Sequence, residues 1–321
     1  MDRGAAPRRV PMWWAVLMAA AIGGLAGCAL PSGGGASAIS EPAASGSSNA
    51  SSNASNASST ASTSSTSGVS SKSSTSSTSS APAAIPAKLL RTIDLPLTGT
   101  VPLFAGAPGK EVPDGWELWT LHPSKARTRY RLGRDADGVT VAAQAESGAS
   151  GLVRRLSLSP LVMPMIEWRW KVDQLIPGAD NTDRYAEDAP VRIVLAFDGD
   201  KRSLPLRERM FFEQVRLLSG QDMPYATLMY IWENKQPVGT VILNPNTSRV
   251  RKLVVASGDK QLKRWQRFRR NVVADYIQAF GKPPGNLIGV AILTDTDNTR
   301  QRASALYGDL RIGRLPMWEG D

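Results

Sequence analysis

The chain has 321 residues, of which 42% are hydrophobic and 21% charged, and its formal net charge at pH 7 is +10. It contains one cysteine, Cys28, and one histidine, His122. These counts exclude an intramolecular disulfide and any metal site built from several thiolates or imidazoles. A Ser-His-Asp triad would have to use His122, and no G-x-S-x-G pattern surrounds a serine beyond residue 87.

The N-terminus has the pattern of a secretory signal. Arginines at positions 3, 8 and 9 precede an apolar stretch, 12–24, that is shorter than the roughly 20 residues needed to span a bilayer. The stretch ends in "LAGC" (25–28), which resembles the lipobox of bacterial lipoproteins. The resemblance implies that residues 1–27 are a lipoprotein signal peptide and that Cys28 is lipidated, including with palmitate. Ala29, and not Asp, follows Cys28 at the second mature position. By resemblance to the sorting rule of enterobacterial lipoproteins, this favours the outer membrane. The alternative is an ordinary secretory signal with a chance cysteine.

The segment that follows predicts a disordered tether. Residues 28–87 are almost wholly Ser, Ala, Thr, Gly and Asn after the cysteine. Such a composition buries too little apolar surface to offset the entropy of ordering. A flexible chain of about 59 residues has a root-mean-square reach of roughly 40 Å, so the tether lets a domain stand away from the membrane. We expect residues 88–321 to form one domain.

Most of that domain is predicted to be β-sheet, because apolar and polar residues alternate along it. In "IEWRWKVD" (166–173) the apolar side chains share one face and the charged side chains share the other. Turn residues such as "DADG" and "NPNTS" separate the predicted strands. We expect these strands at 127–133, 138–145, 151–158, 166–173, 190–198, 225–232, 238–243, 249–257, 287–294 and 304–312.

Two helices are expected to interrupt the strands. One covers 203–220, with a stripe of Leu206, Met210, Val215 and Leu218 and a stop at Gly220. The other covers 260–284, where apolar residues recur every three or four positions and "KQLKRWQRFRR" supplies a strongly basic stretch. That stretch is either a solvated basic face or a surface that docks on anionic lipid or polysaccharide.

About ten strands with two helical insertions predict a mainly β fold, a two-sheet β-sandwich of the jelly-roll type. The closing segment "ALYGDLRIG" (305–313) resembles the last strand of galactose-binding-like and carbohydrate-binding jelly rolls. In several of those families an Asp of this strand binds a structural calcium ion. The resemblance therefore implies a calcium ligand at Asp309, although no other ligand of that site can be matched in this chain.

A second resemblance covers residues 113–312. The chain is similar to a bacterial family known as domain of unknown function 3047. The similarity implies a common fold and an extracytoplasmic setting, and it implies no activity. It is carried by "SGLVRRL", "EWRWKVD", "GADNTDRYAEDAP", "VLAFDGD", "RERMFFE", "PYATLMYIWEN", "VVADYIQAFG" and "LTDTDNT".

Two acidic loops are the best candidates for a ligand-binding site. "PGADNTDRYAEDAP" and "TDTDNT" share an Asp-Asn-Thr core, and both follow apolar stretches. Carboxylate and amide oxygens suit hard cations such as Ca²⁺ and also accept hydrogen bonds from sugar hydroxyls. The alternative is that these residues only form turns and caps. The candidate residues are Asp180, Asn181, Asp183, Asp188, Asp295, Asp297 and Asn298.

Two further residue types suggest glycan chemistry. Paired carboxylates could hydrolyse a glycosidic bond if they lay about 5–5.5 Å or 6.5–9.5 Å apart, and Glu233, Glu167 and Asp295 are available. Tryptophans could stack on sugar rings, although an alternating Trp in a strand more often belongs to the core. We assign Trp168 and Trp170 to the core and expect Trp116 and Trp119 to be held more loosely; Trp232 and Trp265 are the remaining candidates.

These observations lead to one main hypothesis and two alternatives. The main one is a lipid-anchored envelope protein whose sandwich binds a glycan or another anionic envelope polymer, with calcium as an open question. A basic domain suits such partners, and nucleic acid is a poor fit for a secreted chain. The alternatives are a polysaccharide hydrolase that uses Glu233 and Asp295, and a scaffold that binds periplasmic proteins.

Overall fold

A computed structural model describes residues 100–121 and 124–314, and all of them belong to one compact unit. The predicted signal peptide (1–27), Cys28 and the predicted tether (28–87) lie outside these residues. The described elements are β1 (Thr100–Pro102), β2 (Glu117–Thr120), β3 (Arg129–Asp135), β4 (Gly138–Glu146), β5 (Ala149–Leu158), β6 (Met165–Val172), β7 (Ala189–Phe197), the 3₁₀ turn η2 (Lys201–Ser203), α1 (Leu206–Ser219), β8 (Ala226–Glu233), β9 (Val241–Leu243), β10 (Val250–Ser257), β11 (Gln266–Asn271), α2 (Val272–Phe280), β12 (Leu287–Asp295) and β13 (Arg302–Gly313).

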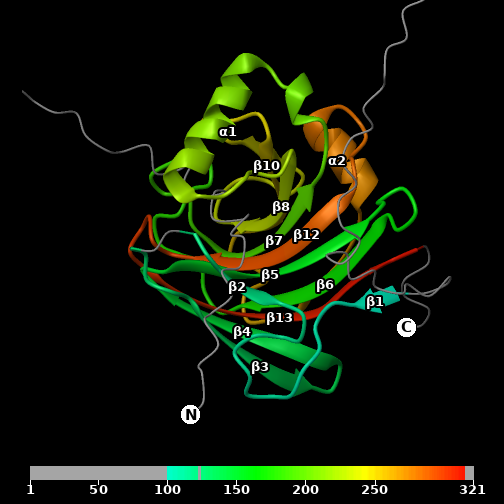
Figure 1. The fold of residues 1–321 in the computed structure, drawn as a ribbon. Coiled ribbons are helices and arrows are strands. Elements are labelled where there is room, and N and C mark those ends of the chain that lie inside the picture. Colours follow the sequence, from blue (N-terminus) through cyan, green and yellow to red (C-terminus); the bar gives the residue numbers. More distant parts are fainter. Residues whose placement is uncertain (1–99, 122–123, 315–321) are drawn as a thin grey trace, which may run out of the picture. The chain divides into compact units, whose positions relative to one another are not determined.

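The strands form two sheets that pack face to face (Figure 1). Sheet A has the order β11-β6-β13-β4-β3, with β1 paired to β13. Sheet B has the order β2-β5-β12-β7-β8-β10-β9. Successive strands from β4 to β7 alternate between the sheets, and β12 and β13 do the same. This winding is that of a jelly-roll β-sandwich, which confirms the predicted fold class.

The ten predicted strands are all present, with ends within three residues of the expected positions. Strands β1, β2 and β11 were not predicted. The first two are three and four residues long, too short for alternation to be visible. Strand β8 pairs in parallel with β10, which is an exception in an otherwise antiparallel sheet.

The prediction of one helix over 260–284 is wrong. Residues 266–271 form β11, which pairs antiparallel with β6 at the edge of sheet A. Helix α2 begins only at Val272, where the Asn271 side chain accepts hydrogen bonds from the first backbone N–H groups. Phe268 points to the core, and the arginines on either side of it are exposed, so the segment also fits a period of two. The basic stretch therefore supplies a charged edge strand, which discourages pairing with other sheets.

Helix α1 lies where a helix was expected, but it faces the other way. Leu206, Met210 and Leu218 were predicted to form its buried stripe together with Val215, yet they are 64%, 63% and 79% exposed. The buried residues are Glu208, Phe212 and Val215. Glu208 fixes this orientation, because its carboxylate accepts hydrogen bonds from Thr247 Oγ1 at 2.5 Å and Ser248 N at 2.7 Å.

Aromatic side chains fill the space between the sheets. Trp168 of β6 stacks on Tyr230 of β8 and on Phe268 of β11, with ring centroids 5.0 and 5.1 Å apart. Trp170 is fully buried beside it, as predicted.

The other four candidate tryptophans, all within the described residues, are buried or half-buried. The expectation that Trp116 and Trp119 are loosely held is wrong, because they are only 6% and 3% exposed. Trp116 also donates a hydrogen bond to the carbonyl of Leu103 at 2.8 Å. Trp232 is fully buried, and Trp265 is partly covered by the guanidinium of Arg169.

A bulge at the end of β12 positions the second acidic loop. The pairing of β12 with β7 shifts between Leu293 and Asp295. Two buried tyrosines of sheet A reach across the core to this bulge: Tyr307 donates to the Leu293 carbonyl at 2.7 Å, and the Thr294 N–H donates to Tyr130 Oη at 3.3 Å. These bonds hold the backbone that follows, beginning with Asp295, in a fixed orientation.

Candidate functional site

The two acidic loops lie side by side at neighbouring strand ends of sheet B. One loop leads into β7 and the other leaves β12, and these strands are antiparallel neighbours. Their pairing places Ala189, the first residue of β7, opposite Asp295, the last residue of β12. We call residues 180–188 and 295–299 the loop junction.

Arg192 occupies the centre of the junction. Its side chain and that of Asp295 are both fully buried, and they form a two-pronged ion pair with N–O distances of 3.1 and 3.0 Å. Its other donors reach Asn181 Oδ1 at 3.0 Å and the Glu187 carbonyl at 2.8 Å. Arg192 therefore ties the first loop to the end of β12 through charge-assisted hydrogen bonds.

A second buried cation supports the same loop. Lys252 of β10 donates to the Asn181 carbonyl at 2.8 Å and pairs with Glu187 Oε1 at 2.9 Å. Burial lowers the pKa of Lys252 to about 8, although Glu187 opposes the shift. Burial also raises the pKa of Asp295 to about 7; Arg192 opposes this shift, and Asp188 and Asp297 reinforce it. The junction is thus a buried network in which Arg192 and Lys252 face the carboxylates of Asp295 and Glu187, with Asp188 and Asp297 close by.

Asp188 binds the second loop directly. One carboxylate oxygen accepts from the N–H of Asn298 at 3.2 Å, and the other accepts from Thr299 N and Oγ1 at 2.7 and 2.6 Å. Asn298 in return donates to the Arg184 carbonyl at 3.1 Å. The predicted residues Asn181, Asp188 and Asp295 are therefore buried and hold the loops together, whereas Asp180, Asp183, Asp297 and Asn298 reach the surface to different extents.

Glu233, one of the two carboxylates assigned to the alternative hydrolase, lies beneath the first loop and is 1% exposed. Its carboxylate accepts from the backbone N–H of Asn181 at 2.9 Å, of Gln236 at 3.1 Å and of Lys235. The other, Asp295, is enclosed by Arg192. Both carboxylates order backbone and neighbouring side chains in this arrangement, and neither is presented to solvent.

The exposed rim of the junction carries an aromatic side chain that sequence reasoning did not select. Tyr185 is 67% exposed, and in the described part of the chain it is the one aromatic residue that is neither buried nor half-buried. Its N–H donates to Asp183 Oδ1 at 2.9 Å, and the Arg184 guanidinium lies 4.6 Å from the centre of its ring. The signal for it was the Arg-Tyr pair inside an acidic loop.

Three carboxylates of the junction come close enough to consider a metal ion. One oxygen each from Asp188, Asp295 and Asp297 lie within 4.8 Å of one another. Each carboxylate, however, already faces a protein donor: Asp295 faces Arg192, Asp297 pairs with Lys125 at 2.6 Å, and Asp188 accepts from the second loop. A metal ion here would therefore compete with protein donors for these carboxylates.

Asp309, the residue to which the jelly-roll resemblance assigns calcium, also faces a cation. Its Oδ2 accepts from Arg169 Nε at 2.6 Å, and the same guanidinium bonds to Asp135 and Asp137. A calcium ion at Asp309 would have to displace this buried arginine, so the contacts do not favour it. Calcium binding stays a prediction.

Glu167, the third carboxylate considered for acid–base chemistry, lies on the outer face of β6. Its side chain is fully buried, and neither oxygen has a hydrogen-bond donor among the described residues; Arg269 Nε is 3.4 Å away. Burial raises the pKa of Glu167 to about 7, against the influence of Arg269 and Arg311.

We therefore expect Glu167 to make stability depend on pH. An ordinary Glu titrates near pH 4.3, so over about pH 4.5–7 the folded protein keeps a proton that the unfolded chain has lost. The unfolding free energy should fall as pH rises through that window, and Glu167→Gln should remove this part of the decline. Urea unfolding at pH 5 and pH 8 measures it, with Glu117→Gln, at a half-exposed glutamate, as control. Identical pH profiles for the wild type and Glu167→Gln would contradict the expectation.

His122 lies outside the described residues. Among the described residues, no helix is long and apolar enough to cross a membrane.

Comparisons with known proteins identify the family to which the chain belongs. The profile of a family described as protein of unknown function, DUF3047, matches residues 114–311, and the chain belongs to that family. This confirms the resemblance seen in the sequence. A search of curated proteins found no match.

Several solved structures are similar in outline at very low sequence identity. A family 12 xyloglucanase from Bacillus licheniformis aligns with 6% identity over 67% of this chain and 98% of its own, with a TM-score of 0.36. The xyloglucanase domain of a type three effector from Sinorhizobium fredii aligns with 8% identity over 66% and 99%, with a TM-score of 0.35. A family 30 carbohydrate-binding module from Clostridium thermocellum aligns with 9% identity over 68% and 98%, with a TM-score of 0.29.

Proposed function

We propose that this chain is a lipid-anchored protein of the bacterial envelope, favouring the outer membrane, whose sandwich binds a polysaccharide at the loop junction. The lipobox pattern at Cys28 supports the anchor, and the long Ser/Ala/Thr-rich tether supports a domain that works at a distance from the membrane. The observation that carries the binding proposal is Tyr185, which stands exposed on a junction that is otherwise fixed by buried bonds.

The rim around Tyr185 has the mixed chemistry that sugars require. An exposed ring offers an apolar face, and the partly or fully exposed polar groups of Asp183, Arg184 and Asn298 lie beside it. Because Arg192 and Asp188 hold both loops, these groups would not need to be ordered when a ligand binds, which reduces the entropic cost of binding. Arg184 and the net positive charge of the chain favour an acidic polymer over a neutral one.

Tyr185→Ala should weaken polysaccharide binding about fivefold to tenfold, the effect expected for losing one stacked ring. Affinity electrophoresis of the whole chain in gels that contain lipopolysaccharide or purified acidic and neutral bacterial polysaccharides measures this. Tyr185→Phe should retain binding, and Leu161→Ala is a matched control because Leu161 is also 67% exposed.

Two results would count against the proposal. One is a wild-type chain whose migration no polysaccharide retards. The other is a Tyr185→Ala chain that is retarded as strongly as the wild type.

A further inference from the structure

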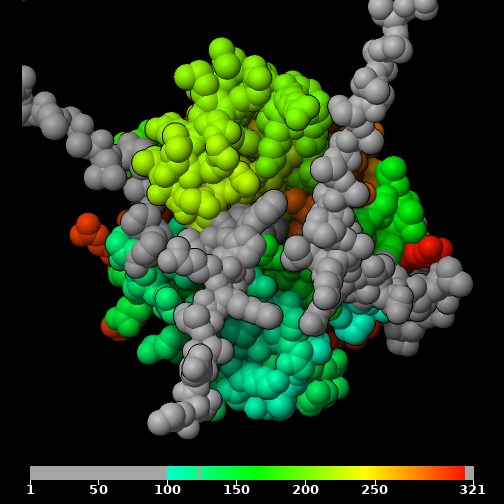
Figure 2. All heavy atoms as spheres, in the orientation of Figure 1, coloured from blue at the N-terminus to red at the C-terminus, as the bar shows by residue number. Residues whose placement is uncertain are grey.

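The outer face of α1 carries an apolar ridge that no described element covers. Leu206, Met210 and Leu217 are spaced by four and seven residues, so they lie on one side of the helix. They are 64%, 63% and 80% exposed, and Leu218 beside them is 79% exposed. Figure 2 shows the α1 residues, coloured yellow-green, at the surface at the top of the view.

This exposure follows from how the helix is held. Glu208 bonds to the segment around Thr247, and Phe212 and Val215 pack into the core, which fixes the opposite side outward. Isolated exposed apolar residues are ordinary, but three of them on one side of a helix, with a fourth next to them in sequence, form a feature that points to an interaction.

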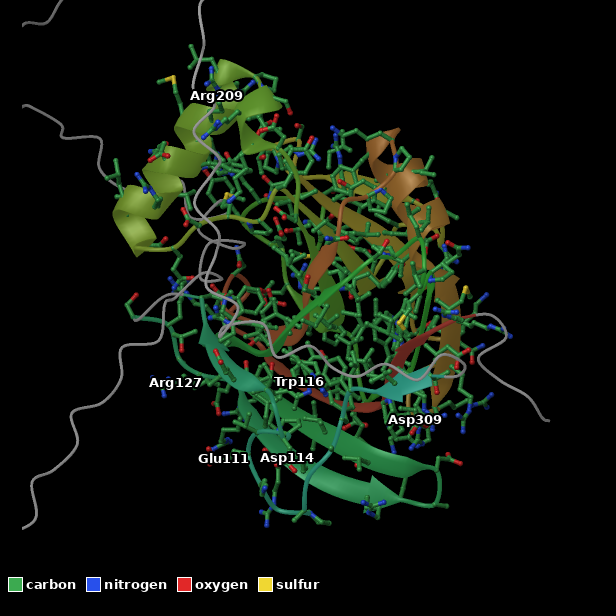
Figure 3. All side chains as sticks on the ribbon, turned by 45° about the vertical axis from the view of Figure 1, so that its right-hand side comes forward. Glu111, Asp114, Trp116, Arg127, Arg209 and Asp309 are labelled. Atoms are coloured by element: carbon green, nitrogen blue, oxygen red, sulfur yellow. The ribbon has the colours of Figure 1, made fainter. Side chains whose placement is uncertain are left out.

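Positive charge flanks the ridge on both sides. Arg207, Arg209 and Arg216 are exposed along α1 and carry this charge, because Lys201 and Arg202 in η2 are offset by the exposed carboxylates of Asp198 and Asp200 before them. Glu213 is the single exposed acidic residue of the helix, and it is paired with Arg216 at 2.8 Å. Figure 3 shows Arg209 on α1, well separated from Asp309 on β13.

We propose that α1 lies on the surface of a bilayer that contains anionic phospholipid, with Leu206, Met210 and Leu217 dipped among the acyl chains. An apolar helix face bordered by arginines is the pattern of an interfacial helix, in which the basic side chains contact lipid phosphates. The face is a convex ridge and not a groove, which suits a fluid surface. This contact is separate from glycan binding at the loop junction, and it would rest the domain against the membrane to which Cys28 is predicted to tether it.

A label at one position of α1 tests the proposal in the whole chain. Because Cys28 is the only cysteine, Cys28→Ser combined with Leu217→Cys gives a single site for an environment-sensitive fluorophore. Vesicles of phosphatidylglycerol and phosphatidylethanolamine that carry a nitroxide quencher in their acyl chains should quench this label. The apolar segment 12–24 could itself bring the chain to vesicles, but it would not by itself bury a label at position 217.

The controls separate α1 contact from general binding. The same label at Leu161→Cys, an exposed site outside α1 (67% against 80% for Leu217), should stay unquenched. Adding Met210→Glu to the Leu217→Cys chain should raise the lipid concentration for half-quenching about tenfold. Vesicles of phosphatidylcholine alone should quench the Leu217→Cys label far less.

Three outcomes would overturn the proposal. One is a label at position 217 that remains as unquenched as the label at 161 on anionic vesicles. Another is equal quenching on phosphatidylcholine, which would remove the role of the arginines. The third is shielding of the label without lipid as protein concentration rises, which would show that a second copy of the chain covers the ridge.

Discussion

Replacing Arg192 with methionine is expected to destabilise the domain by about 3–5 kcal/mol, the range for removing one partner of a buried ion pair. Without the guanidinium, the buried carboxylate of Asp295 would lose its direct partner while Asp188 and Asp297 stay close to it, and only the more distant Lys252 would oppose their charge. The carbonyl of Glu187 and the amide oxygen of Asn181 would lose their donor as well. Urea unfolding of the purified protein measures the loss.

The cost of Arg192→Met should also depend on pH in a definite direction. Burial already raises the pKa of Asp295 to about 7, and losing Arg192 can only raise it further. Above that pKa the carboxylate must ionise in an apolar site, whereas at lower pH it can stay protonated. The stability of the variant should therefore be nearer to that of the wild type at pH 5 than at pH 8.

Two further variants make the expectation specific. Arg192→Met combined with Asp295→Asn should be less destabilised than the sum of the single variants, because the uncompensated charge is gone. Arg216→Met, at an exposed arginine paired with Glu213, should change stability by no more than about 0.5 kcal/mol. If Arg192→Met cost no more than Arg216→Met, the buried network would not hold the loops.

The sheet framework was predictable from the sequence because alternation separates the side chains that pack between the sheets from those on the outer face of a strand. A strand such as 166–173 shows its inner and outer faces in its letters, and turn residues mark its ends. The loop junction was partly predictable, since two similar acidic loops drew attention to the correct residues. Their convergence was not, because it depends on which strands are neighbours in the sheet.

The parts that sequence reasoning missed are those set by single long-range contacts. The spacing of apolar residues in α1 fits a buried stripe, but the bonds of Glu208 to the distant segment 247–248 turn the helix. In 260–284, the spacing of the apolar residues fits both the period of two of a strand and the period of 3.6 of a helix. Pairing with β6 makes residues 266–271 a strand.

Arg192 and Lys252 left a readable signal that was not used. Arg192 is the one charged residue of "VRIVLAF", and Lys252 follows Arg251 in the largely apolar run "VRKLVVA". A cation in such a run is buried with the strand and requires a partner. The acidic loops were the available source of one, so this pattern could have indicated that several of their carboxylates are structural.

Replacing Arg169 with methionine is the second change expected to have a large effect, about 2–4 kcal/mol, since it removes a fully buried cation from three carboxylates. The guanidinium ties β6 to β13 through Asp309 and to the β3–β4 turn through Asp135 and Asp137. It also lies 4.1 Å from the ring of Trp265, so an attractive cation–π contact is lost too. Asp135 and Asp137 are 34% and 48% exposed and can be hydrated, which keeps the expected cost below that of Arg192→Met.

Measurements at the Asp309 site can distinguish stabilisation by the buried Arg169 from stabilisation by a bound calcium ion. Arg169 hydrogen-bonds to Asp135 and so lowers the pKa of that carboxyl. The ionised pair stabilises the folded wild type at pH values above the ordinary Asp pKa, and this stabilisation is lost as the pH falls through the lowered pKa. Arg169→Met should lose this stabilisation, whereas Lys171→Met, at a neighbouring residue of β6 that also lies near Trp265, should retain it.

Millimolar calcium should leave the unfolding temperature of the wild type unchanged, because Arg169 already supplies the positive charge at Asp309. A rise with calcium that Asp309→Asn abolishes would instead identify Asp309 as a calcium ligand, since binding to the folded state alone must stabilise it.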